Sequence, residues 1–458
     1  MKARGILSLA IVAALVLALG AAAATPQNVN VSKLPGPQTQ PAITVDPRND
    51  RVLLAGSNSI EEGTMRIYMS GDGGGTWETT LAHERPAKLL DSCSSDPSVA
   101  IDTQGRQYYS YVRAVPCRSG APQRVYVLVR AGPDEAWSKP VLVAPLGRAR
   151  VDDKPAIAVD NSPVSRFRGR VYLTWARIER SVSISIVLSH SDDGGKTWSK
   201  PVKVNTTGSE LSYASVAVAR NGAVYVAWDD VGEFSLHVAR STDGGATFGP
   251  QRRVASFPSI WIPHCGAGVV IPALPRTCVN ANPVVTVDAS GGRHSGRVYM
   301  SYARTEFRGR QAAHVAVFTS SLKRIDPEPD TGEGRPIAPA PPRRRSEQFW
   351  VQSAVDQTSG ALWVCFYDTL GDPNRKRAHY SCTVSRDGGG TWAKPRRAAA
   401  VASDATQPGA IGGYGYYEGL AVANGIAHPI WTDSRDLATL AEEIYSTRLT
   451  LADFKRSG

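Results

Sequence analysis

The chain contains 458 residues, more than one hydrophobic core usually supports, and carries a formal net charge of +11. A charge of this sign is a common signal for nucleic acid. Here the basic runs are scattered, which favours an arginine-rich solvated surface or attraction to acidic glycans. We therefore expect no nucleic-acid partner, and the lack of a long apolar segment beyond the N-terminus excludes a membrane-spanning domain.

The N-terminus has the pattern of a secretory signal peptide. Lys2 and Arg4 precede an apolar run from Ile6 to Leu19, and small residues follow as far as Ala24. Such a run, between a basic start and small residues, is typical of a cleaved export signal and is too short for a typical membrane span. The pattern predicts a signal peptide over residues 1–24 and a secreted protein, extracellular or periplasmic, over residues 25–458.

An octet of the form Ser-x-Asp-x-Gly-x-Thr-Trp occurs four times, each time just after a strand-like run. The copies are Ser70–Trp77, Ser191–Trp198, Ser241–Phe248 and Ser385–Trp392. In such an octet the Asp and Ser side chains bond back to the turn backbone, and Gly takes a positive φ. One copy would be a turn, whereas four copies indicate a repeat architecture.

The repeat is larger than the octet. Each copy has a strand, a turn and a second strand rich in Tyr and Val, and the octet follows a third strand. Seven such strand pairs are present, and their first strands close at Asp46, Asp102, Asp160, Ala219, Asp288, Asp356 and Asn424. Four strands at this spacing of 56 to 69 residues make one propeller blade.

The predicted fold is therefore all-β: a β-propeller of seven four-stranded blades in a single domain. The seventh copy lacks a fourth strand of its own, whereas the segment from Pro26 to Val31 has the character of one. We expect this N-terminal strand to complete the last blade and close the ring, which leaves no open sheet edge. Residues 326–345, rich in Pro, are expected to form a long loop of the fifth blade.

Six cysteines in an exported chain predict disulfides. Their placement within or beside single blades favours local pairs. The predicted pairs are Cys93–Cys117, Cys265–Cys278 and Cys365–Cys382. Because no Cys-x-x-Cys pair occurs and the octet aspartates are used by their own turns, we expect no metal and no other cofactor.

The octet resembles the Asp-box of the BNR-repeat sialidase superfamily, and the resemblance covers residues 25–458. The motif is specific for the fold, but similar boxes occur in sialidases, other glycosidases, some polysaccharide lyases and non-enzymatic propellers. The resemblance implies a monomeric, sialidase-like exo-glycosidase whose partner is an acidic, carboxylate-bearing glycan. Two alternatives stay open: a non-catalytic propeller that binds glycan or protein, and a lyase of uronate polysaccharides.

Arginine lies at the end of the second strand in four copies. In the sialidase family the pocket lies on the face away from the octets, where an arginine cluster holds the substrate carboxylate. The matching residues, predicted to bind substrate, are Arg113, Arg177, Arg304 and Arg435. In the alternative interpretation each arginine pairs with an acid of a neighbouring blade. Asp229 and Asp230 stand where another arginine would be expected, and a Phe/Tyr-Arg-Ile-Pro motif is absent.

The last blade opens on Tyr414-Gly415-Tyr416-Tyr417-Glu418. Sialidases use a tyrosine nucleophile activated by a glutamate, with an aspartic acid as acid/base. The resemblance therefore implies that the catalytic residues are Tyr417, Glu210 and Asp153, with Glu418 and Asp96 as alternatives for the base and the acid. Tyr416 and Glu418 are predicted to contact substrate. The alternative is that this Gly- and Tyr-rich stretch only packs the centre of the propeller.

Overall fold

The computed structural model describes residues 26–454 except 85–86, 89–90, 119–120, 146, 148, 180–182, 209, 258–259, 263–265, 307–308, 327–334, 339–345 and 412. The predicted signal peptide lies outside the described residues. Those that are described form an all-β protein, as expected, and its helical content is the short 3-10 helix η1 (Leu451–Asp453). Within these residues no helix has the length and apolar character needed to cross a membrane.

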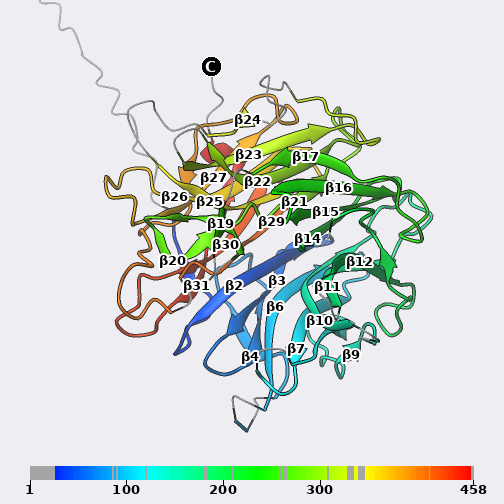
Figure 1. Cartoon of the computed structure of the whole chain (residues 1–458), viewed down its shortest axis with the longest axis horizontal. Helices are drawn as coiled ribbons and strands as arrows, with labels where there is room; N and C mark the ends of the chain where they lie inside the picture. Colours follow the sequence, from blue (N-terminus) through cyan, green and yellow to red (C-terminus); the bar gives the residue numbers. More distant parts are fainter. Residues whose placement is uncertain are drawn as a thin grey trace, which may run out of the picture.

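The strands form antiparallel groups of four that follow one another along the chain (Figure 1). The first group is β2 (Gln38–Asp46), β3 (Asn49–Ser59), β4 (Thr64–Ser70) and β5 (Glu78–Leu81). The second is β6 (Cys93–Ile101), β7 (Gln107–Ala114), β8 (Gln123–Arg130) and β9 (Val141–Leu142). The third is β10 (Ala149–Val159), β11 (Val171–Glu179), β12 (Ile184–Ser191) and β13 (Val202–Lys203). A parallel bridge between Val151 and Gln123 joins the second and third groups into one sheet.

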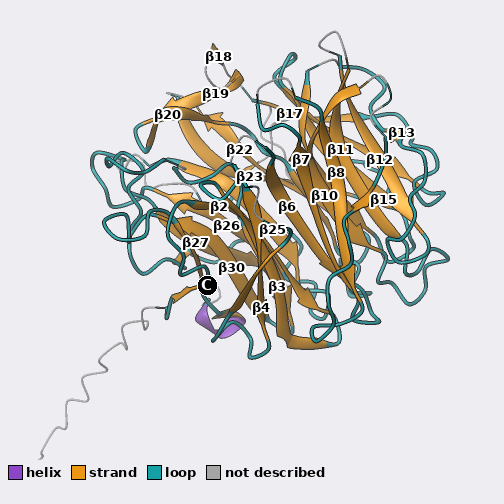
Figure 2. Cartoon of the chain, turned by 90° about the horizontal axis from the view of Figure 1, so that it is seen from below, coloured by secondary structure: helices purple, strands orange, loops and turns teal. Residues whose placement is uncertain are grey.

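The later strands repeat this order around an insertion. The fourth group is β14 (Leu211–Val218), β15 (Val224–Asp230), β16 (Ser235–Ser241) and β17 (Arg252–Ser256). The inserted sheet is β18 (Ile260–Ile262), β19 (Gly266–Ile271) and β20 (Leu274–Val279). Figure 2 shows these three strands standing out at one edge of the molecule.

After the insertion come two further groups of four. One is β21 (Val284–Val287), β22 (Val298–Glu306), β23 (Arg310–Phe318) and β24 (Arg335–Pro336). The other is β25 (Gln348–Val355), β26 (Leu362–Asp368), β27 (His379–Ser385) and β28 (Arg396–Arg397). Strand β24 lies within residues 326–345, so this segment is not wholly a loop as expected, because Arg335 and Pro336 pair with β23.

The last group combines both ends of the chain. It contains β29 (Gly419–Ala423), β30 (Ile426–Asp433), β31 (Glu443–Ser446), β32 (Leu449–Thr450) and the N-terminal β1 (Val29–Asn30). Val29 lies opposite Ser446 and Asn30 opposite Tyr445, so β1 is the outer neighbour of β31. The expected addition of an N-terminal strand to the last sheet is therefore present.

The first strands of the groups pack against one another in the middle of the molecule. Each of β2, β6, β10, β14, β21 and β25 contacts the first strand of the next group, and β29 contacts β2. Large side chains on the second strands fill the space between neighbouring sheets, and Trp175, Trp228, Trp363 and Trp431 are completely buried. The core is thus a set of inter-sheet layers rather than one central mass.

The octets form the turns that the sequence predicts. In the third copy the Ser241 hydroxyl donates to Asp243 Oδ1 at 2.7 Å, and the Thr247 amide donates to the same oxygen at 3.0 Å. The Thr247 hydroxyl donates to Asp243 Oδ2 at 2.5 Å. These bonds lower the pKa of Asp243 to about 2 although burial opposes the charge. Both oxygens of the Asp243 carboxylate are therefore hydrogen-bonded within the turn.

Two of the predicted disulfides are confirmed. Cys93 bonds Cys117, and Cys365 bonds Cys382, which faces it directly across β26 and β27. The third predicted pair includes Cys265, which lies outside the described residues. Cys278 is itself disulfide-bonded.

Candidate functional site

A cavity of about 200 Å³ lies where the first strands meet, at their starting ends. The octets lie beyond the third strands, at the other ends of the sheets. Apolar residues form much of the wall. Its polar lining residues include Lys154, Tyr213, Asn282, Tyr417 and Glu418.

The backbone at the rim of this cavity departs from regular strand geometry in the same way in six groups. One non-glycine residue of each group, within its first strand or, for Asn282, two residues before it, has a positive φ. These residues are Gln40 (55°), Asp96 (60°), Lys154 (49°), Tyr213 (48°), Asn282 (43°) and Trp350 (49°). Each lies six residues before the residue at which its first strand was predicted to close. In five of the groups a shift of strand register marks a β-bulge at this point.

Such bulges re-aim a side chain, and a positive φ at a non-glycine residue costs on the order of 1–3 kcal/mol. Strain of this kind persists only where neighbouring groups hold it, and it concentrates at functional sites. At Asp96 the holding group is Asn58, whose Oδ1 accepts from the Asp96 amide at 3.0 Å while its Nδ2 donates to Gln40 Oε1. We call the six residues the hub ring.

Lys154 is the centre of a polar cluster in the hub ring. Its Nζ lies 3.6 Å from Asp96 Oδ1. The same ammonium group lies 4.8 Å from the ring centroid of Tyr213, 5.3 Å from that of Tyr416 and 5.9 Å from that of Tyr417. An ammonium surrounded by aromatic rings and one carboxylate is held in place and stays charged.

Electrostatics in this cluster keep Lys154 protonated and shift the pKa of Asp153 upward. Burial opposes the Lys154 charge, but Asp96, Tyr213 and Asp153 together raise the pKa of Lys154 above its ordinary value. The pKa of Asp153 is also raised, because burial outweighs the attraction of Lys154 and Asp96 adds repulsion. Asp153 Oδ1 accepts a hydrogen bond from Gln123 Nε2 at 3.4 Å.

Tyr417, which precedes the last strand group, contacts a residue of the second strand group at the cavity. Its hydroxyl donates to Asp96 Oδ1 at 3.3 Å, across 321 residues of sequence. Burial, and then the charge of Asp96, raise the pKa of Tyr417 well above its ordinary value, so the phenol is neutral. A neutral phenol in contact with a carboxylate is the arrangement of a nucleophile with its base.

Both carboxylate oxygens of Glu418, the next residue, have hydrogen-bond partners within the protein. Its Oε1 accepts from the Tyr367 hydroxyl at 2.9 Å and its Oε2 from the Thr432 amide at 2.9 Å. Burial raises the pKa of Glu418 well above the usual range. Of the two predicted substrate contacts in this stretch, Tyr416 is 41% exposed, whereas Glu418 is buried.

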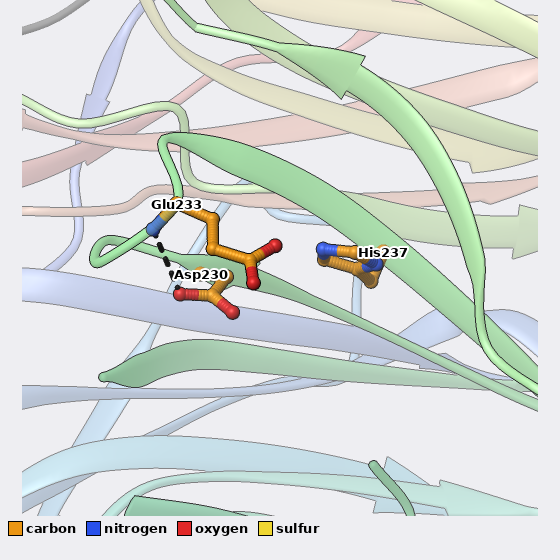
Figure 3. Close-up of side chains that lie close together, drawn as sticks. All are labelled: Asp230, Glu233 and His237. Atoms are coloured by element: carbon orange, nitrogen blue, oxygen red, sulfur yellow. Dashed lines mark hydrogen bonds between the residues drawn. The ribbon is translucent and has the colours of Figure 1, made fainter. Parts of the chain in front are cut away.

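Glu210, the predicted base, is not brought to Tyr417. It lies at the start of β14, where its backbone carbonyl accepts from the Val231 amide at 2.8 Å and its charge acts on Asp230. This places it near a second polar cluster, made of Asp230, Glu233 and His237 (Figure 3). Asp96 occupies the place beside Tyr417 that was expected for Glu210.

The four predicted arginines are not among the residues that line the cavity, and each has its own partners. Arg177 forms a fork on buried Asp152, at 2.8 and 3.0 Å. Arg113 donates to the Ser92 hydroxyl at 3.1 Å, and Arg304 contacts Glu306, also at 3.1 Å. Each of these partners belongs to the same strand group as its arginine or to the chain just before it.

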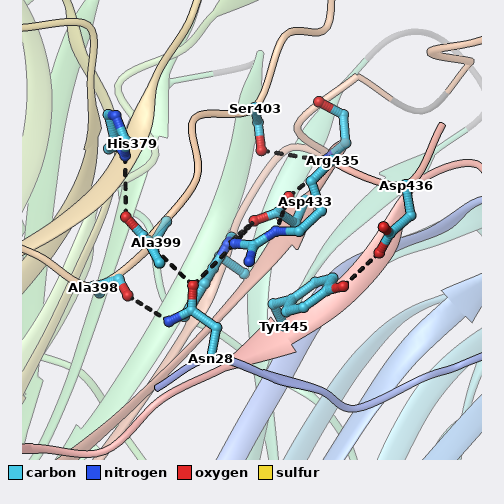
Figure 4. A network of polar contacts seen from close by, with 12 residues as sticks. Asn28, His379, Ala398, Ala399, Ser403, Asp433, Arg435, Asp436 and Tyr445 are labelled. Carbon is cyan, nitrogen blue, oxygen red and sulfur yellow. Dashed lines mark hydrogen bonds and ion pairs between the residues drawn. The ribbon is translucent and has the colours of Figure 1, made fainter. Parts of the chain in front are cut away.

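Arg435 illustrates what these arginines do. It forks onto Asp433 at 2.9 and 2.7 Å, and its Nη2 donates to Asn28 Oδ1 at 3.0 Å (Figure 4). Asn28 in turn donates to the Ala398 carbonyl at 2.8 Å and accepts from the Ala400 amide at 2.7 Å. The guanidinium group therefore ties the N-terminal segment to β30. The alternative, in which each arginine pairs with an acid of a neighbouring blade, is not met either, because the acids that do pair belong to the arginine's own strand group and Arg113 contacts a serine.

Two features of the site were missed by sequence reasoning. Lys154 was not given a role, and the bulge was not foreseen. A signal for the bulge was present, since the hub-ring residue precedes a proline at Pro41, Pro97, Pro155 and Pro283. Asp229 is a further missed group: it is fully buried, and burial raises its pKa to about 7 although the backbone amides of Asp229 and Ser212 and the charge of Lys154 oppose this.

No protein-family model and no curated protein matches the sequence. Solved structures do match. A polysaccharide lyase, the PL25 ulvan lyase, superposes with a TM-score of 0.53 at 11% identity, covering 93% of this chain and 98% of the lyase. The Hadza microbial sialidase Hz136 superposes with a TM-score of 0.50 at 14% identity, covering 92% of this chain and 66% of the sialidase.

A protein of unknown function from Dyadobacter fermentans is similar as well, with a TM-score of 0.50 at 16% identity over 78% of this chain and 97% of that one. This chain spans just under two thirds of the sialidase and nearly the whole of the other two. At such identities the likeness concerns the fold. The chain has the β-propeller fold of the sialidase and the polysaccharide lyase.

Proposed function

We propose that the chain is a secreted, sialidase-like glycoside hydrolase that acts on carboxylate-bearing glycans at the central cavity. The observation that carries this proposal is the 3.3 Å contact between the Tyr417 hydroxyl and Asp96, beside the charged Lys154. A propeller that only binds its partner needs no tyrosine–carboxylate pair of this kind. The likeness to a sialidase and to a polysaccharide lyase supports a glycan as the substrate.

The mechanism follows from the three neighbouring groups. The Tyr417 oxygen attacks the anomeric carbon while its proton passes to Asp96, and the bond to the leaving sugar breaks. Asp153, whose pKa burial raises above its ordinary value, gives its proton to the leaving oxygen. Asp153 then removes a proton from water, which attacks the same carbon, and Tyr417 leaves and recovers its proton from Asp96. Two displacements retain the anomeric configuration.

Lys154 and Tyr416 are the proposed binding groups for the acidic sugar. Lys154 is the one basic residue among those lining the cavity, so a substrate carboxylate would meet it first. A neutral phenol also suits this substrate, since an anionic nucleophile would be repelled by the carboxylate. The half-exposed Tyr416 ring, close to Lys154, offers an apolar face to the sugar.

A uronate lyase is the second candidate, and one observation favours it. The site holds a single lysine at the cavity where sialidases have an arginine cluster. A lysine that neutralises a uronate carboxylate, next to a tyrosine, also suits proton abstraction from the adjacent carbon. The PL25 ulvan lyase, which has this fold, was solved bound to -[GlcA(1-4)Rha3S]-.

The deciding experiment compares wild-type chain with Asp96→Asn on sialosides and on uronate polymers. Hydrolysis releases new reducing ends without ultraviolet absorption, whereas elimination also creates a conjugated, absorbing product. We expect hydrolysis by wild type, and a rate about 10²–10⁴-fold lower for Asp96→Asn, which keeps the hydrogen bond but loses the base. Asp91→Asn, an exposed acid in the same chain segment, is the control and should act like wild type.

Binding of these glycans without any turnover would instead establish a non-catalytic propeller. Elimination products would establish the lyase. Equal activity of Asp96→Asn and wild type would remove Asp96 from the mechanism while leaving the glycan specificity to be judged from the substrates cleaved.

We also propose that residues 25–458 form one closed propeller of seven blades, exported from the cell. The pairing of β1 with β31 and the contact of β29 with β2 support closure. The disulfides support an oxidising compartment. Deleting residues 26–34 should lower the melting temperature of the whole domain, and an unchanged melting temperature would argue against closure.

A further inference from the structure

The second polar cluster lies at the turn between β15 and β16, apart from the cavity-lining residues. Asp230 ends β15, Glu233 lies in the turn, and His237 lies on β16 (Figure 3). One ligand atom from each of the three side chains lies within 4.8 Å of the others. Figure 3 shows the Glu233 side chain extending from the turn toward His237, with the Asp230 carboxylate beside it.

Asp230 has one oxygen in use and one without a partner. Its Oδ1 accepts from the amides of Gly232 and Glu233, both at 3.1 Å, and this fixes the carboxylate. Its Oδ2 is buried and has no hydrogen-bond partner, and the residue is only 1% exposed. A buried carboxylate oxygen without a partner is costly and needs an explanation, such as an ion.

The charges around Asp230 favour a cation. Its pKa is raised first by burial, and then by the negative charges of Glu233 and Glu210, which the turn amides oppose. Three acids therefore share one small region. A bound divalent cation would relieve this repulsion and pair the free oxygen.

His237 is prepared to act as a ligand. Its ring stacks on Trp228 at a centroid distance of 5.7 Å, and the residue is only 5% exposed. Nε2 hydrogen-bonds the Ser235 hydroxyl at 2.9 Å, and the Gln251 amide approaches Nδ1 at 3.3 Å. Metals bind the neutral form of an imidazole, and burial lowers the pKa of His237. In a metal-bound histidine one ring nitrogen binds the ion and the other keeps its partner, so one of these two contacts is released when the ion binds.

We propose that Asp230, Glu233 and His237 form a binding site for a divalent metal ion of the zinc type. One imidazole nitrogen and two carboxylates suit Zn²⁺, whereas Ca²⁺ and Mg²⁺ prefer oxygen ligands alone. Donors on a tetrahedral zinc ion lie about 3.4 Å apart, so the exposed Glu233 need move only a little to close the site. Three protein ligands leave the fourth position of a tetrahedral zinc ion for a water molecule. This site is independent of the proposed hydrolase activity.

The test is calorimetric titration of Zn²⁺ into the chelator-stripped full-length protein. We expect wild type to bind one Zn²⁺, and Glu233→Gln to bind it at least about tenfold more weakly. Glu233 is exposed, so this variant should melt like wild type in the absence of metal. Glu135→Gln, at another exposed glutamate, in the turn after β8, is the control and should bind like wild type.

Two further measurements make the result specific. Asp230→Asn should weaken binding as Glu233→Gln does, and Co²⁺ bound to wild type should show the visible spectrum of a low-coordinate site that is lost in both variants. No Zn²⁺ binding by wild type at about 100 μM, or equal binding by wild type and Glu233→Gln, would overturn the proposal.

Discussion

The octet turns and the hub ring lie at opposite ends of the same repeated unit, and they differ in where their polar groups find hydrogen-bond partners. In the octets the same residue types recur, and the aspartate is bonded by its own Ser and Thr, which lowers the pKa of Asp72, Asp193 and Asp243 to about 2. In the hub ring the residue type changes from group to group, and the backbone is strained.

This difference separates what holds the fold from what can do chemistry. In an octet the aspartate accepts hydrogen bonds from residues of the same octet. Each copy can therefore have the same sequence, and its carboxylate needs no group from another part of the chain. A hub-ring residue depends on neighbouring sheets, as Asp96 does on Asn58, Lys154 and Tyr417. Repetition at one end and divergence at the other indicate that the octets stabilise the sheets and that the hub ring carries the function.

The largest expected effect comes from Tyr417→Phe. The change removes only the hydroxyl that donates to Asp96, so substrate affinity should stay within a factor of about two while the turnover number falls by about 10³ or more. Steady-state kinetics on the cleaved glycan, with affinity measured separately by calorimetry, checks this. A variant that keeps wild-type turnover would show that the tyrosine only packs the centre.

Lys154→Met should come next. The substrate carboxylate would lose its charged partner at the cavity, so affinity should fall by roughly 30- to 150-fold, or about 2–3 kcal/mol. The salt dependence of binding should weaken as well. Lys200→Met, an exposed lysine just after an octet, is the matched control. Equal affinities of the two variants would contradict a role for Lys154 in binding.

Asp243→Ala tests the other end of the unit. It removes the acceptor for Ser241 and for the amide and hydroxyl of Thr247, which should lower the free energy of unfolding by about 1–3 kcal/mol. Urea unfolding measures the loss. Glycan affinity should not change, and a change in affinity would show that the two ends are coupled.

The smallest effect is a pH dependence at the octet end. His428 is buried next to Gly74 of the first octet, and burial lowers its pKa from 6.5 to about 4. Between these values the unfolded chain binds a proton that the folded protein does not, so stability falls as the pH drops from about 6.5 toward 4. By pH 5 the contribution is about 1–2 kcal/mol. It should be absent from His428→Gln when unfolding free energies at pH 7 and pH 5 are compared.

Local patterns in the sequence predicted much of this structure. The octet bonds join residues at most four positions apart, so their geometry depends on the octet alone. The alternating Val and Tyr strands predicted the all-β fold, and the placement of Cys365 and Cys382 predicted their pairing. Tyr417 was placed near the centre because it opens the last strand group.

The partners of the charged side chains were decided by packing between distant segments. Arg177 and Asp152 meet because β10 and β11 pair. The guanidinium group is therefore bound to Asp152, whereas the repeat symmetry of the sequence had suggested that it would bind a ligand. Asp96 reaches Tyr417 across 321 residues, so no spacing in the sequence could mark it as the nearby carboxylate. The octet turns are determined by hydrogen bonds between residues close in sequence. A buried charged side chain instead pairs with whichever group the surrounding sheets bring close to it, and only the tertiary structure decides which group this is.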